Sequence, residues 1–197
     1  MICVKQIVND VFASNTYVLS NDNSNEYWLV DVGDFNKVTD ILPENAIVKG
    51  VFLTHSHFDH IYGLNDLHKR FPNCIVFTSE YGKEAIYSEK KNFSYYHDSP
   101  MSYTGENVCV IKNNAIVELW NEVSMKVVAT PGHCPSCLTY VLDKYIFTGD
   151  SYIPGVPLVT KLPKGNKKQA EESKNYILRL ANGKNICAGH GEIVLNL

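Results

Sequence analysis

Short runs of β-branched and aromatic residues recur along the chain, and polar segments separate them. Runs of four to eight such residues between turn-forming segments are typical of β-strands. The polar segment 20–26 lies between the first two runs and predicts a hairpin turn. The pattern predicts strands at 15–20, 26–32, 47–54, 73–79, 115–120, 123–130, 137–142, 144–149 and 185–189.

Three other stretches have the spacing of helices. The first follows His60 and runs to about Arg70, and the second covers 79–91 with Ser79 as its N-cap. The third covers 166–182, with Asn166 as its cap. Gln169 completes a capping box, Asn182-Gly183 is a stop signal, and the apolar stripe is Ala170, Ile177, Leu180 and Ala181. Strands that come first as hairpins and then alternate with helices predict a mixed α/β (α+β) fold.

The composition narrows the function classes. The 197 residues, 45% of them hydrophobic, suit a single domain over 1–197 with a sizeable core. A net charge of -3 with only two arginines excludes an obvious nucleic-acid binder. No apolar run approaches the roughly 18 residues that span a bilayer, and the first residues do not resemble a signal peptide. The six cysteines are irregularly spaced, so we expect a reduced, cytoplasmic protein that binds neither nucleic acid nor membrane.

Five of the predicted strands are each followed by histidine or aspartate residues. Loops at one edge of a rigid scaffold are where functional side chains gather, so these residues are expected to converge on one point. They are Asp31 after the second strand, the group His55, His57, Asp59 and His60 after the third, and His133, Asp150 and His190 after three later strands.

The segment THSHFDH at 54–60 is the densest of these groups. Imidazole and carboxylate ligands suit zinc, and they also suit iron or manganese. Leaving Asp31 aside, seven candidate ligands are too many for one tetrahedral zinc ion and sufficient for two ions if one carboxylate is shared. The sequence therefore predicts a two-metal centre with Zn²⁺ as the expected ion.

THSHFDH, TPGH at 130–133, TGD at 148–150 and AGHG at 188–191 occur in the order seen in the metallo-β-lactamase superfamily. Within it the chain most resembles the small glyoxalase II-like hydrolases, over nearly its whole length. The resemblance implies a four-layer αββα sandwich with the metals at one edge. It also implies that His55, His57 and His133 hold the first ion, Asp59, His60 and His190 hold the second, Asp150 bridges them, and Asp31 orients a ligand from beneath.

The same resemblance implies a reaction. A hydroxide shared by two zinc ions would attack the carbonyl carbon of a thioester or ester, as in hydroxyacylglutathione hydrolases, with Asp59 also relaying the proton. The same comparison argues against three groups of relatives. His60 and Asp150 do not match the ligand pattern of class B1 β-lactamases, and Ser56-His57 does not match the motif of flavodiiron proteins. The chain also has little room for the inserted domain of the nucleic-acid-processing members.

Two alternative functions stay open, and a third is disfavoured. One is a persulfide dioxygenase with a single iron held by two histidines and an aspartate. Another is a lactonase or phosphodiesterase that uses the same two-metal centre. A non-catalytic binding module is disfavoured because no ligand position is degraded.

Substrate recognition is assigned to loops, because the helical C-terminal domain of glyoxalase II has no counterpart after Gly191. The surface left open by that domain would favour a homodimer. The loop 92–107 is rich in Tyr and Phe, and its Asn92 and Ser94 resemble residues near the site in small relatives; the alternative is a surface loop.

Three further features have weaker assignments. Lys161 is a candidate for binding an anionic end of the substrate, although the favoured interpretation of the lysines of 161–168 is a solvated helix start. Cys134 and Cys137 form a CxxC pair that permits redox chemistry, with two structural cysteines as the simpler interpretation. His68 and His97 are interpreted as surface residues.

Overall fold

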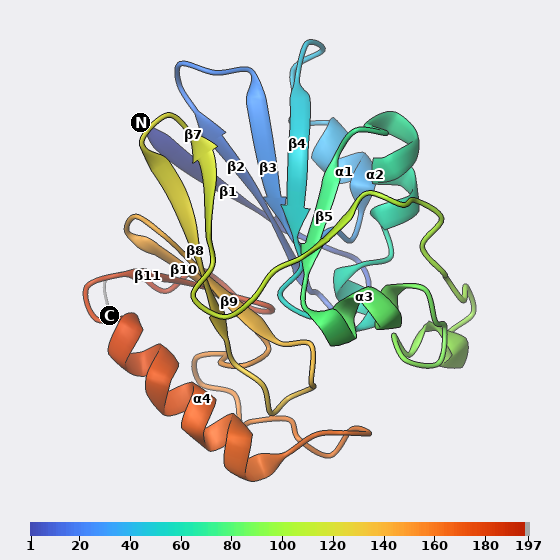
Figure 1. The fold of residues 1–197 in the computed structure, drawn as a ribbon, viewed down its shortest axis with the longest axis vertical. Coiled ribbons are helices and arrows are strands. Elements are labelled where there is room, and N and C mark those ends of the chain that lie inside the picture. The colour runs from blue at the N-terminus through green and yellow to red at the C-terminus, as the bar shows by residue number, and fades with distance from the viewer. Residues whose placement is uncertain (196–197) are drawn as a thin grey trace.

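The strands form two sheets in the computed structural model, which describes residues 1–195 (Figure 1). The first sheet has the order β1–β2–β3–β4–β5–β6 and the second has the order β11–β10–β9–β8–β7. The strands of the first are β1 (Ile2–Val8), β2 (Asn15–Asn21), β3 (Glu26–Val30), β4 (Ile47–Phe52), β5 (Ile75–Thr78) and β6 (Val108–Val110). Those of the second are β7 (Ile116–Trp120), β8 (Val123–Ala129), β9 (Leu138–Leu142), β10 (Tyr145–Gly149) and β11 (Asn185–Ala188).

Alternating side chains direct each strand of the first sheet toward two different cores. Leu29 in β3 belongs to the cluster on the outer face, whereas its neighbours Trp28 and Val30 belong to the cluster between the sheets. This follows from the two-residue repeat of a strand. The inner cluster also contains Tyr140 and Phe147 from the second sheet, so the two sheets pack face to face.

Helices cover the outer face of each sheet. The outer cluster of the first sheet contains Phe35 and Leu67, from α1 (Phe35–Thr39) and α2 (Leu64–Arg70). The second sheet packs through Ile146 and Ile186 against Ile177 of α4 (Lys167–Leu180). Figure 1 shows α1 and α2 on one side of the molecule and α4 on the other. The predicted four-layer αββα sandwich is confirmed.

The remaining elements are α3 (Glu80–Ile86) and two 3-10 turns, η1 (Phe58–His60) and η2 (Ser94–Tyr96). The predicted caps are confirmed: Ser79 Oγ accepts a hydrogen bond from the backbone N–H of Gly82, and Asn166 Oδ1 accepts one from Gln169. The predicted capping box is not formed, because the backbone N–H of Asn166 donates to the carbonyl of Gly132 rather than to Gln169. The stripe predicted for α4 needs one correction. Ser173 is buried and donates to the carbonyl of Pro131, while Leu180 is only half-buried.

Every predicted strand is present, but the pattern missed three elements. β1 has one polar residue on each face, Lys5 and Gln6, which interrupt its apolar run, and β6 and α1 are too short to show a repeat. The second helix was predicted too long: α3 ends at Ile86, after which the chain turns toward Phe93, whose φ of 67° lies in the left-handed region.

Strand direction explains why one edge of the sandwich carries the chemistry. β3, β4 and β5 run parallel to one another, and so do β10 and β11. β8 pairs antiparallel with β9, which pairs antiparallel with β10, so β8 runs in the direction of β10. The carboxyl ends of neighbouring parallel strands meet at one edge.

The start of β2 and the segment that follows β11 also meet at this edge. The backbone N–H of Asn15 donates to Gly189, the hydroxyl of Tyr17 donates to the carbonyl of Ala188 at 2.7 Å, and Ser14 forms an isolated bridge with His190. The start of β2 thereby fixes the segment that follows β11.

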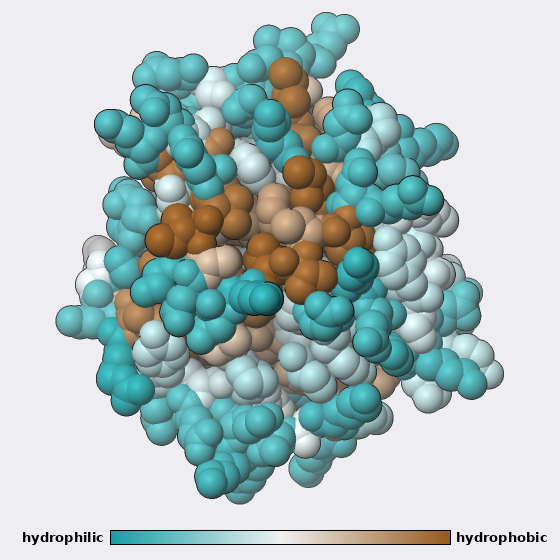
Figure 2. Space-filling model, viewed as in Figure 1, coloured by the Kyte–Doolittle hydropathy of each residue, from teal (hydrophilic) through white to brown (hydrophobic). Residues whose placement is uncertain are grey.

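Figure 2 shows apolar residues gathering in the middle of one face, in the region where Figure 1 places β5 and β7. Ile116 of β7, which is 70% exposed, is the most exposed residue of that strand's apolar set. Among residues 1–195, none of the helices has the length and apolar character needed to cross a bilayer.

Candidate metal centre

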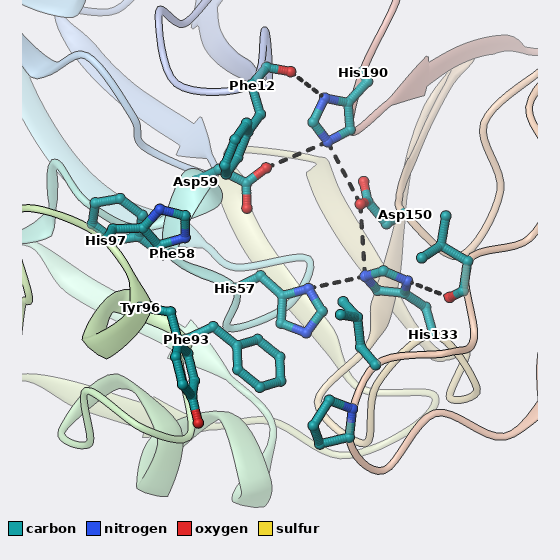
Figure 3. A pocket seen from close by; sticks show the side chains of 13 residues that line it. Phe12, His57, Phe58, Asp59, Phe93, Tyr96, His97, His133, Asp150 and His190 are labelled. Atoms are coloured by element: carbon teal, nitrogen blue, oxygen red, sulfur yellow. Dashed lines mark hydrogen bonds and ion pairs between the residues drawn. The ribbon is translucent and has the colours of Figure 1, made fainter.

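The predicted ligands all follow strands that end at the same edge of the sandwich. Asp31 follows β3, the THSHFDH segment follows β4, His133 follows β8, Asp150 follows β10 and His190 follows β11. In Figure 3 the side chains of His57, His133, Asp150, Asp59 and His190 surround one cavity. The structure therefore brings together residues that are up to 159 positions apart in the sequence, from Asp31 to His190.

His55, His57 and His133 form a first cluster, called here the three-histidine group. One ring nitrogen from each lies within 4.8 Å of the others. Nδ1 of His57 and Nε2 of His133 face each other at 3.0 Å. The other nitrogen of His133, Nδ1, lies 2.7 Å from the carbonyl oxygen of Val159, so the backbone fixes this ring with Nε2 directed into the site.

Asp59, His60 and His190 form a second cluster, called here the Asp59 group. Asp59 Oδ2 lies 3.4 Å from Nε2 of both histidines. Nδ1 of His190 lies 3.1 Å from the carbonyl oxygen of Phe12, which orients this ring as Val159 orients His133.

Asp150 lies between the two groups. Its Oδ2 is 3.6 Å from Nε2 of His133 and 3.5 Å from Nε2 of His190, and its Oδ1 is 3.5 Å from Nε2 of His60. One carboxylate therefore contacts a member of each group, which is the arrangement expected of a bridging ligand.

Asp31 is buried beneath the site, and its oxygens are already engaged. It accepts hydrogen bonds from the backbone N–H of Thr54 at 2.7 Å and from the Thr54 hydroxyl at 2.6 Å, and its Oδ2 lies 2.9 Å from Nδ1 of His60. Asp31 could also form a ligand triad with His55 and His60 by distance alone. Its three partners instead suit the predicted role of orienting His60.

Three buried atoms at the centre lack a hydrogen-bond partner among the described residues: His55 Nε2, His60 Nε2 and Asp150 Oδ1. Leaving such an atom buried and unpaired costs about 1–3 kcal/mol. Imidazole nitrogens and carboxylate oxygens are ligands that divalent cations such as Zn²⁺ bind. The residues present thus fit bound metal.

Electrostatics favour the ligating protonation states at several positions. Burial, together with His60 and His57, holds the pKa of His55 well below its usual value, so this ring is neutral. Burial opposes ionisation of Asp150, but His60 and a hydrogen bond from His190 outweigh it and hold the Asp150 pKa well below its usual range. His60 differs: against the effect of burial, Asp59 and Asp150 raise its pKa to about 9, so a metal would have to displace the proton from Nε2.

A cavity of about 580 Å³ opens above the ligands (Figure 3). Several of the residues that line the cavity were not individually predicted to be functional. His97, which was predicted to be a surface residue, also lines the cavity. The non-ligand lining residues are Phe12, Phe58, Phe93, Tyr96, His97, Val159, Leu162 and Pro163.

The predicted substrate residues lie elsewhere. Asn92 and Ser94 are fully buried and bind Met101: Asn92 Nδ2 donates to its carbonyl at 2.9 Å, and Ser94 Oγ accepts from its N–H at 2.9 Å. Neither lines the cavity, whereas Phe93 between them does. Lys161 is exposed and also lies outside the lining, although its neighbour Leu162 is part of it.

Cys134 and Cys137 are free, buried thiols with their sulfur atoms 3.2 Å apart. Burial opposes ionisation of Cys134, but hydrogen bonds from Cys137 and His57 outweigh it and hold its pKa well below the usual value. The pair therefore lies directly behind the three-histidine group.

An αββα sandwich with clustered histidines and aspartates at one edge defines a class of metal-binding proteins, and comparison with known families agrees. The chain belongs to the metallo-beta-lactamase superfamily, whose family model matches residues 9–190.

Solved structures of similar fold carry different functional names. The crystal structure of BLEG-1, a B3 metallo-beta-lactamase, has 26% identity and a TM-score of 0.88 over 98% of this chain and 93% of its own. ETHE1 from Myxococcus xanthus has 21% identity and a TM-score of 0.76 over 98% and 79%. TTHA1623 in a di-iron-bound form has 19% identity and a TM-score of 0.81 over 98% and 94%. The last two comparisons establish the fold alone.

Proposed function

We propose that this chain is a hydrolase with a two-metal centre that cleaves a thioester or ester bond, with chemistry like that of hydroxyacylglutathione hydrolases. The three-histidine group would hold one ion, the Asp59 group would hold the other, and Asp150 would be shared. The observation that carries the proposal is the contact of Asp150 with His133 of one group and with His60 and His190 of the other.

Two zinc ions bound there would supply Lewis acidity and a nucleophilic water near neutral pH. The chain's own residues have separate tasks. Asp59 borders the cavity with a side chain that is 13% exposed, so it can hold or relay a proton as well as ligate. Asp31 holds His60, and the carbonyls of Phe12 and Val159 hold His190 and His133.

The two groups also favour the hydrolase over a one-iron persulfide dioxygenase. A single iron with two histidines and one aspartate would leave several of the seven converging side chains without a partner. Buried groups of this kind are costly when unpaired. Two ions engage all seven.

The test begins with metal analysis of the purified protein and reconstitution with zinc. Hydrolysis of S-lactoylglutathione and of a neutral thioester, S-butyryl-N-acetylcysteamine, is then measured with and without a chelator. The proposal predicts about two ions per chain and turnover of at least one thioester that the chelator abolishes. His57→Ala and Asp150→Ala should lose both metal and turnover, whereas His68→Ala on α2 should retain them.

Two results would overturn the proposal. One iron per chain with oxygen consumption on a persulfide would establish the dioxygenase instead. Two bound metals with no hydrolysis of thioesters, esters, lactones or phosphodiesters would remove the hydrolase assignment.

A further inference from the structure

The walls of the cavity differ sharply from its metal-facing floor. Apart from the candidate ligands, one wall consists of the rings of Phe12, Phe58, Phe93, Tyr96 and His97. Val159, Leu162 and Pro163, in the segment before α4, also line the cavity. Apolar walls around a few polar groups are the usual composition of a site for a small molecule.

The rings support one another rather than lying independently. His97 stacks on Phe58 with ring centres 4.9 Å apart and meets the edge of Phe12 at 5.3 Å. Phe93 lies 4.9 Å from the ring of His57 and 6.4 Å from that of Tyr96. Figure 3 shows both sets on the same side of the cavity, with Phe12 above and Phe93 below.

The backbone is held in a disfavoured conformation at both ends of this wall. Phe12 has a φ of 53° and Phe93 a φ of 67°, a region that bulky side chains rarely adopt. Such conformations persist where the surrounding structure enforces them, and they gather at ligand sites. Phe12 is also 63% exposed and Tyr96 71% exposed, so these rings offer apolar surface at the mouth of the cavity.

The charges around the cavity also favour an uncharged ligand. No lysine or arginine of residues 1–195 lines it, and its only formal charges besides the histidines are the carboxylates of Asp59 and Asp150. Lys164 lies over the ring of Tyr81, which is outside the lining. An anionic group placed against the aromatic wall would therefore lose water without gaining a cationic partner.

We propose that the cavity selects thioesters and esters that are uncharged and apolar, with Phe12 and Phe93 as the specificity-determining residues. This inference rests on the proposed hydrolase function and narrows its substrate class. It predicts that a glutathione thioester, which carries carboxylates, is a poorer substrate than a neutral thioester with the same acyl group.

The test uses N-acetylcysteamine thioesters on the zinc-loaded protein. Across acetyl, butyryl and hexanoyl, kcat/KM should rise about threefold to fourfold for each added methylene, the factor expected from burial of one methylene group. S-butyryl should exceed S-succinyl, which replaces the terminal methyl by a carboxylate, by about tenfold or more. S-butyryl-N-acetylcysteamine should likewise exceed S-butyrylglutathione.

Matched variants assign the preference to the wall. Phe12→Gly and Phe93→Gly remove a ring while allowing the left-handed backbone that glycine adopts freely. Each should flatten the chain-length dependence, so that the ratio of hexanoyl to acetyl kcat/KM falls, because the hexanoyl group loses apolar surface to pack against and the acetyl group buries little. Tyr95→Ala is the control, since Tyr95 is 53% exposed and lies outside the lining.

A binding measurement separates failure of the inference from failure of the proposed function. Fluorescence titration with N-phenyl-1-naphthylamine, a neutral apolar probe, should show binding that Phe93→Gly weakens at least about tenfold and Tyr95→Ala does not. If no ester is hydrolysed but the probe binds in this way, the hydrolase proposal fails and the apolar cavity stands. Hydrolysis without a chain-length dependence, or with succinyl preferred over butyryl, overturns the inference alone.

Discussion

Replacing Asp31 by asparagine should weaken metal binding although Asp31 contacts no metal in the proposed centre. The carboxylate accepts from the N–H and hydroxyl of Thr54 and from Nδ1–H of His60, so Nε2 is the nitrogen of His60 that would give up its proton to a metal. An amide has one acceptor oxygen. If that oxygen keeps the bond from the Thr54 N–H, the amide NH₂ faces His60 Nδ1.

That reversal changes the tautomer of His60. A donor facing Nδ1 favours the ring with its proton on Nε2, which is the atom that faces Asp59 and Asp150. Loss of such an orienting partner typically costs 10–100-fold in metal affinity, or about 1.4–2.7 kcal/mol. The free energy of unfolding of the metal-free protein should also fall by about 1.5–3 kcal/mol, the contribution of one hydrogen bond to a charged group.

The assay is competition with a chromophoric chelator for zinc, together with urea unfolding of the metal-free protein. Asp34→Asn is the matched control. Asp34 accepts hydrogen bonds from Tyr62 and from the backbone of Asp10 but contacts no candidate ligand. It should lose stability without losing zinc affinity. Wild-type zinc affinity in Asp31→Asn would refute the reasoning.

Three other outcomes follow from the structure. Gly189→Ala should abolish binding of at least one metal ion, because its Cβ would overlap Asp150 Oδ1 and lie 2.9 Å from His60 Cε1. Gly183→Ala, whose Cβ meets open space, is the control and should bind metal as the wild type does. Equal metal content in the two variants would contradict this prediction. Ellman's reagent should titrate two thiols quickly in the native protein, Cys3 and Cys109, and all six after denaturation; fast reaction of a third thiol would show that a buried cysteine is accessible. Asn166→Ala should lower the free energy of unfolding by about 1 kcal/mol in urea, since it removes the cap of α4, and an unchanged midpoint would show that the cap contributes nothing.

The sequence predicted the strands and the convergence of the ligand candidates for a physical reason. A strand shows its two-residue repeat and its end in the sequence itself, and His or Asp placed directly after such an end is carried to the sheet edge. The spacing within 54–60 then required only a short loop. β1 was missed because Lys5 and Gln6, one on each face, interrupt its apolar residues, so it lacks an apolar run.

The walls of the cavity had no comparable signal. Whether a loop side chain enters the cavity depends on backbone dihedrals such as the positive φ of Phe12 and Phe93, which no hydrophobic pattern encodes. The loop 92–107 contributes Phe93 to the cavity wall, whereas the prediction named its neighbours Asn92 and Ser94. Near Lys161 the charge drew the prediction, whereas the apolar Leu162 lines the cavity.

The bonds between the start of β2 and the segment after β11 affect how the centre comes into being during synthesis. Asn15 Nδ2 donates to the carbonyl of Ala188 across 173 positions, and His190 is held by the carbonyl of Phe12. Of the seven candidate ligands, His190 is the last to leave the ribosome, whereas Phe12, whose carbonyl orients it, is among the first residues to emerge. A nascent chain can bring six ligands together, but the Asp59 group is complete only when the segment after β11 pairs with the start of β2. Such distant pairing is slow to form, so loading with metal should be a late event that reports completion of the whole fold.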